Sequence, residues 1–80
     1  MAKSIYSAGQ ERLQELLRAV RLEADLTQMD LATRLQKPQS FVSKYESGER
    51  RLDLVKLQQV CGALEIDLVQ FVRRFVKAGN

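Results

Sequence analysis

The sequence predicts an all-α fold, a compact bundle of five short helices. Apolar residues recur at helical spacing almost throughout, and the first such run has leucine or valine at positions i, i+3, i+4 and i+7 from Leu13 to Val20. Short polar residues that cap helices stand before most of the runs, and no strand-like alternation persists. We therefore expect helices near residues 8–22, 27–35, 38–46, 53–64 and 67–77.

Polar residues mark where the first two helices begin. Ser7 with Gln10, three residues on, has the pattern of a capping box before the first helix. Thr27 with Asp30 forms an acidic variant of the same box before the second helix. Asp25 stands between these helices, where a short polar side chain tolerates a left-handed backbone.

The later helices carry similar signals. Pro38 suits the first turn of the third helix, and its ring pushes Lys37 out of the helical region. Asp53 can cap the fourth helix, and Asp67, with Gln70 three residues on, can cap the fifth. Only short connections remain between the five helices.

The composition bounds the class of protein. With 45% apolar residues, one proline and four glycines, the 80 residues fit one domain with little room for linkers. We expect residues 1–6 to be a loose tail and residues 7–80 to be a single domain. The one cysteine, Cys61, excludes an internal disulfide, lies on a packed helix face as an inert core residue, and favours a reducing, cytoplasmic location. No apolar run is long enough for a membrane span, and no secretory signal is visible.

Catalysis is not expected. The chain has no histidine, no glycine-rich phosphate loop and no cluster with metal-ligand spacing. Its acidic residues are scattered and fit caps and surface pairs. The sequence therefore predicts no enzyme activity, no metal and no cofactor.

The positive charge is concentrated in the middle of the chain. The formal net charge is +3, and residues 28–51 hold five basic and three acidic side chains. A central excess of positive charge hints at a polyanion such as nucleic acid as partner, although an ordinary solvated surface is the alternative.

Residues 28–46 match a helix-turn-helix, two short helices joined by a brief turn. Ala32 supplies the small residue that a close helix crossing needs, while Val42 and Tyr45 form the inner face of the second helix. The polar residues of the outer face are Gln39, Ser40, Ser43 and Lys44. Glutamine can bond adenine N6 and N7 together, and lysine can reach guanine O6 and N7, so this face is suited to read base edges.

Phe41 also lies on this second helix. Since Val42 and Tyr45 already fill the inner face, we expect Phe41 to be at least half exposed. It is then a candidate base-reading residue, through a thymine methyl group or a sugar.

Three runs along the chain resemble one family. They are LTQMDLA (26–32), QSFVSKYESGERR (39–51) and LQQVCGALEID (57–67). Together they resemble the Cro/repressor-type, XRE-like helix-turn-helix family over roughly residues 10–72. The resemblance implies a five-helix fold of the lambda-repressor-like type and sequence-specific regulation of transcription.

The resemblance also implies roles for single residues. Gln28 matches the glutamine that bonds a phosphate and braces the one that opens the recognition helix, here Gln39. Gln39, Ser40 and Lys44 match base-reading positions, and Ser43 is placed to touch a base or a phosphate. The other residues predicted to contact phosphates are Lys37, Ser47, Arg50 and Arg51, and for the two arginines a minor-groove contact and a plain surface charge stay open.

Three positions in this region have structural interpretations. Glu46 occupies a place where the family often keeps an acid, and we expect it to pair with a nearby arginine. Gln36 stands where the family often has glycine, so a left-handed conformation there would cost about 1 kcal/mol or more and the turn is expected to differ slightly. Leu52 replaces a proline that is often seen in the following loop.

The last helix has a wider apolar face than a small core needs. We expect it to form the interface of a homodimer that binds a palindromic operator as a repressor; the predicted interface residues are Leu68, Phe71, Val72, Phe75 and Val76, with Val69 on the same face. The alternative is the antitoxin of a toxin-antitoxin pair, which binds its toxin through this face and regulates its own gene through the same motif. A plain helical scaffold is a third reading.

Overall fold

The computed structural model describes residues 8–79, and these residues form five helices without a strand. The helices are α1 (Ala8–Glu23), α2 (Gln28–Leu35), α3 (Gln39–Ser47), α4 (Leu54–Ala63) and α5 (Leu68–Ala78). The prediction of five helices is confirmed, and every boundary lies within one residue of the expected position. The expected tail of residues 1–6 and the expected cap Ser7 lie outside the described residues. Within residues 8–79, no helix is long and apolar enough to cross a lipid bilayer.

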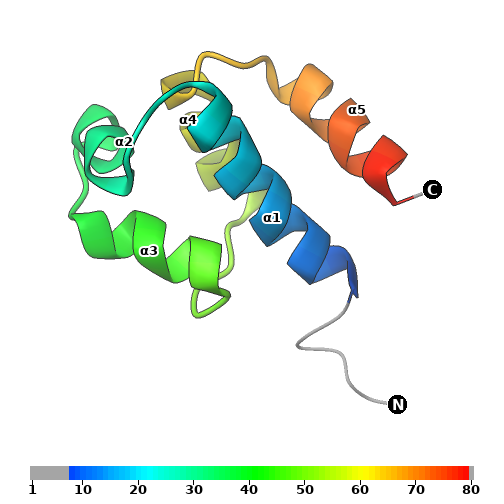
Figure 1. Cartoon of the computed structure of the whole chain (residues 1–80), viewed down its shortest axis with the longest axis horizontal. Coiled ribbons are helices and arrows are strands. Elements are labelled where there is room, and N and C mark those ends of the chain that lie inside the picture. The colour runs from blue at the N-terminus through cyan, green and yellow to red at the C-terminus, as the bar shows by residue number, and fades with distance from the viewer. Residues whose placement is uncertain (1–7, 80) are drawn as a thin grey trace.

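The helices are arranged around α1. α2 and α3 lie on one side of α1, and α5 lies on the other side (Figure 1). α4 contacts α2 and α5, so it joins the two sides, while α3 and α5 both contact α1. The arrangement leaves the outer surface of α3 uncovered by any other described helix (Figure 1).

Every helix contributes to one apolar core. Its buried apolar residues are Leu17, Val20, Leu31, Ala32, Phe41, Val42, Tyr45, Val60, Cys61, Leu64 and Phe71. Ala32 is fully buried, as expected for a close helix crossing, and Val42 and Tyr45 are buried as predicted. Burial raises the pKa of the Cys61 thiol to about 11, which keeps it protonated and unreactive near neutral pH.

Local hydrogen bonds fix the helix starts. The predicted capping box is present, because Thr27 Oγ1 accepts from Asp30 N at 3.0 Å and Thr27 N donates to Asp30 Oδ2 at 3.0 Å. The Asp53 carboxylate accepts from Lys56 N at 2.8 Å, and the Asp67 carboxylate accepts from a backbone N–H at 2.7 Å. Pro38 is the N-cap of α3 and so stands one residue before the first turn in which it was expected.

Several helices end on a left-handed residue that has a side chain. Asp25, Gln36 and Glu65 have φ of 62°, 57° and 61°. Asp25 was expected to tolerate this conformation. Gln36 adopts the left-handed conformation itself, so the expectation that the missing glycine would alter the turn is wrong. The bond from Lys37 N to Ala32 O, 3.0 Å long, closes the end of α2 and holds the turn.

Candidate nucleic-acid interface

α3 presents a polar face to solvent and an apolar face to the core. Gln39, Ser40 and Lys44 are exposed and Ser43 is half-buried, so the predicted base-reading residues other than Phe41 share one accessible surface. The turn before α3 and the loop after it carry the predicted phosphate contacts Lys37, Ser47, Arg50 and Arg51, all exposed. The structure therefore brings the two predicted groups together, with cations at both ends of the polar helix.

Phe41 is buried, with 7% of its surface exposed, so the prediction of a half-exposed ring is wrong. Its ring packs edge-on against Tyr45, with centroids 5.5 Å apart. Lys37 Nζ lies 5.7 Å and Arg50 Cζ 4.9 Å from the Phe41 ring centroid, which places both cations against the ring. The inner face of α3 is wider than two residues because the turn before it and the loop after it both fold over the ring. Because the ring is buried, the prediction that Phe41 contacts a base is no longer supported.

Two glutamines connect α2 to the start of α3. Gln39 Nε2 donates to Gln28 Oε1 at 3.4 Å, and Gln28 Nε2 donates to Glu46 Oε1 at 3.1 Å. The brace between Gln28 and Gln39, which the family resemblance implied, is present. Because a side-chain amide has two N–H donors, Gln39 keeps its carbonyl oxygen and one N–H for another partner.

Beneath the glutamines lies a buried ion pair. Arg21 Nε lies 2.8 Å from Glu46 Oε2, and the two side chains are 7% and 4% exposed. Arg21 Nη2 also donates to Glu46 Oε1 at 3.1 Å, and its Nη1 donates to Leu26 O at 2.8 Å. The hydrogen bonds to Glu46 raise the pKa of Arg21, so the guanidinium stays charged in the fold. The expectation that Glu46 pairs with an arginine is confirmed.

Sequence reasoning did not single out Arg21. A signal was present, because Arg21 follows Leu17 by four residues and so lies on the apolar face of α1. A charged residue on that face needs a buried partner of opposite charge, and Glu46 is the acid that α3 supplies.

The predicted dimer interface on α5 is only partly exposed. Phe71 is 1% exposed and belongs to the core, so its assignment to an interface is wrong: it lies on the side of α5 that meets the rest of the bundle. Leu68 and Phe75 are half-buried, and the Arg12 guanidinium lies 4.8 Å from the Phe75 ring centroid. The exposed large apolar residues of α5 are Val69, Val72 and Val76, at 57%, 40% and 54%.

The geometry defines a class of protein. A short helix is pinned by its apolar face, carries hydrogen-bonding side chains on its free face and is flanked by cations, which is how a helix-turn-helix presents its second helix to a DNA major groove. No group of three or more potential metal ligands occurs in the described part of the chain.

The comparisons with known proteins place the chain in a family. A family model described as "Helix-turn-helix" matches residues 17–71, which is more than half of the chain. An XRE-family like protein from Pseudomonas syringae pv. tomato str. DC3000 is 37% identical, with 91% of this chain and 89% of that chain covered and a TM-score of 0.84. The chain therefore belongs to the helix-turn-helix family of DNA-binding regulators, of the XRE type.

Structures of a restriction-modification controller protein, C.Esp1396I, are also similar. Its tetramer in complex with its natural 35 base-pair operator is 26% identical, with 90% of this chain and 95% of that chain covered and a TM-score of 0.83. Another structure, of the wild-type protein, is 26% identical, with 90% of this chain and 92% of that chain covered and the same TM-score. Among curated proteins, none matches the chain significantly.

Proposed function

We propose that this protein is a sequence-specific transcriptional repressor that acts in the cytoplasm and inserts α3 into the major groove of its operator. The observation that carries the proposal is the chain of contacts from Arg21 through Glu46 and Gln28 to Gln39. It fixes the first polar side chain of α3 before DNA arrives, so little side-chain freedom is lost on binding.

The exposed face of α3 is expected to read the bases. With one amide N–H held by Gln28, Gln39 can still donate to adenine N7 and accept from adenine N6. Lys44, one and a half turns further along α3, can reach guanine O6 and N7, while Ser40 and Ser43 can bond either kind of base.

The cations that flank α3 are expected to supply most of the affinity for DNA. Lys37 and Arg50 lie at opposite ends of α3, yet both lie against the ring of Phe41. Phe41 thus contributes to the interface by holding two cations in place rather than by touching DNA. With Gln28, Ser47 and Arg51, these cations supply phosphate contacts that fix the register of α3 along the duplex.

The oligomeric part of the proposal rests on α5. Its three exposed valines form an apolar stripe that a second copy can cover. A two-fold dimer would set two recognition helices about 34 Å apart and match a palindromic operator. C.Esp1396I, whose structure on its natural operator is a tetramer, supports assembly of copies on DNA.

The first experiment selects bound sequences from random duplex DNA and then tests Gln39→Ala on the selected operator. We expect the substitution to cost about 1–3 kcal/mol at one base position and to relax the base preference there. Gln59→Ala is the matched control, because Gln59 is an exposed glutamine on α4. Unchanged affinity and unchanged base preference in the Gln39 variant would show that Gln39 reads no base.

A further inference from the structure

One face of α1 runs alongside α3. Gln14 reaches Gly48, the residue that directly follows α3, since a Cβ placed on Gly48 would lie 2.7 Å from Gln14 Nε2. Arg21, seven residues after Gln14, contacts Glu46. Arg18 lies between them at i+4, so it belongs to the same stripe and faces the last turn of α3.

A hollow of about 270 Å³ lies between this stripe and α3. Its lining residues are Arg18, Arg21, Gln28, Ser43, Glu46 and Ser47. Three of them, Gln28, Ser43 and Ser47, belong to the predicted DNA-contacting set. The hollow is therefore continuous with the polar surface of α3 and open to the same side.

The charge of the hollow suits an anion. Arg21 and Glu46 neutralise each other at its floor, which leaves the guanidinium of Arg18 as its net charge. Among residues 8–79, Arg18 makes no ion pair with a carboxylate. Glu49 accepts a hydrogen bond from Ser47 Oγ at 3.3 Å, so one carboxylate lies beside a lining residue and lowers the attraction for an anion.

Donors surround the space. The guanidinium of Arg18 has five N–H groups, the Gln28 amide has a second N–H beyond the one given to Glu46, and the hydroxyl of Ser43 can rotate to donate. A tetrahedral oxyanion with several acceptor oxygens matches donors that converge from three helices, α1, α2 and α3. A guanidinium binds phosphate with charge-assisted bonds.

We propose that this hollow seats one phosphate of the DNA strand that borders α3, and that Arg18 is a phosphate-contacting residue outside the helix-turn-helix. The proposal rests on the proposed function, because it places α3 in the major groove. It extends the protein footprint on that strand from α2 and α3 to α1.

The test is Arg18→Gln, measured as the affinity for the selected operator and for an unrelated duplex across a range of salt concentrations. Losing one phosphate contact lowers the slope of log K against log salt by about one. We expect a loss on the order of three- to tenfold that is the same for both duplexes, with base preference unchanged. The melting temperature stays that of the wild type because Arg18 is exposed.

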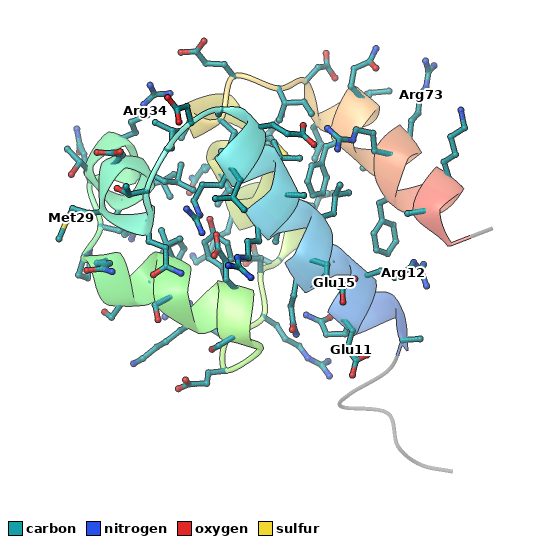
Figure 2. The ribbon with its side chains drawn as sticks, viewed as in Figure 1. Glu11, Arg12, Glu15, Met29, Arg34 and Arg73 are labelled. Atoms are coloured by element: carbon teal, nitrogen blue, oxygen red, sulfur yellow. The ribbon has the colours of Figure 1, made fainter. Side chains whose placement is uncertain are left out.

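Arg73→Gln is the matched control for net charge. Arg73 lies on α5, away from α3 (Figure 2), and we expect its substitution to change the salt slope by clearly less than one. Equal effects of the two variants would overturn the proposal, because net charge alone would then explain them. A lowered melting temperature with an unchanged salt slope would also overturn it, since Arg18 would then only stabilise the end of α3. If the wild type binds its operator and the Arg18 variant has the same affinity and salt slope, only the proposed phosphate site is refuted. If the wild type binds no duplex, the proposed function is refuted.

Discussion

Arg21 enters the core from α1 and keeps its charge there because its donors are occupied. Two of its nitrogens bond Glu46 and a third bonds the Leu26 carbonyl. Removing charges from water is costly, so such a pair is tolerated only with good geometry and satisfied hydrogen bonds. Because the same carboxylate accepts from Gln28, the pair has a second role in fixing the amide that braces Gln39.

Removing one partner of this pair is expected to destabilise the fold strongly. Glu46→Ala leaves the Arg21 guanidinium buried without a counter-charge, and we expect a loss of about 3–5 kcal/mol in the free energy of unfolding, measured with urea. Arg74→Ala is the control: Arg74 and Glu23 also meet at 2.8 Å, but their side chains are 42% and 57% exposed, so we expect a much smaller loss. Equal losses of unfolding free energy in the two variants would show that burial of the Arg21–Glu46 pair does not affect stability.

A double substitution separates stability from DNA reading. Arg21→Met with Glu46→Leu replaces the ion pair by apolar side chains of similar size, and such replacements are often neutral or stabilising. Gln28 then loses its anchor, so we expect a stable fold whose base preference opposite Gln39 is relaxed. Retained preference at that base pair would mean that Gln39 is positioned without the buried pair.

The helix boundaries were predictable because their determinants are local. The bonds that start α2 and α4 join residues three positions apart, so Thr27 with Asp30, and Asp53, could be recognised from spacing alone. Burial of single residues was less predictable. Phe41 is covered because Lys37 and Arg50, from segments on either side of α3, fold over its ring, and periodicity within α3 carries no information about that.

The end of α2 carries strain that a glycine would remove. Gln36 has φ of 57°, and a left-handed conformation costs a residue with a Cβ about 1–2 kcal/mol. We therefore expect Gln36→Gly to raise the free energy of unfolding by about 1 kcal/mol, part of the gain being lost to the freer unfolded chain.

Gly48→Ala provides the opposite substitution at the end of α3. Gly48 has φ of 91°, and an added Cβ would also meet the Gln14 side chain, so we expect a loss of stability. Urea unfolding of both variants checks the signs. A Gln36→Gly variant less stable than the wild type would show that the glutamine side chain stabilises the turn by more than its backbone strain costs.

At the scale of the whole molecule, the site could be predicted in outline and α5 only in part. The polar face of α3 follows from residue types at fixed spacing, which is why the exposure of Gln39, Ser40 and Lys44 could be predicted. The buried role of Arg21, like the proposed phosphate contact of Arg18, could not be predicted because it depends on how α1 packs beside α3, a contact between distant parts of the chain. Phe71 was misassigned for the same reason, since an apolar arc does not reveal which part of it the core already covers.

The three exposed valines of α5 supply the last prediction, which concerns assembly. Val72→Lys places a charge in the middle of the stripe, and we expect it to convert a dimer to a monomer in sedimentation at tens of micromolar protein. Because Val72 is 40% exposed in the single chain, the fold itself should tolerate the lysine. Affinity for a palindromic operator should fall by at least about a hundredfold, toward that of one half-site, whereas affinity for a single half-site should not change.

Met29→Lys is the control for oligomeric state. Met29 is 54% exposed and lies on α2, on the other side of the molecule from α5 (Figure 2), so a lysine there should leave the dimer intact. A wild type that sediments as a monomer, both free and on DNA, would contradict the homodimer. If that monomer instead purifies with a small protein that Val72→Lys releases and Met29→Lys does not, α5 binds a different partner, as the antitoxin alternative requires. If Val72→Lys abolishes the dimer and Met29→Lys does not, the α5 stripe forms the contact between copies. The reason is that the added charge is buried by the second copy only when it lies on α5.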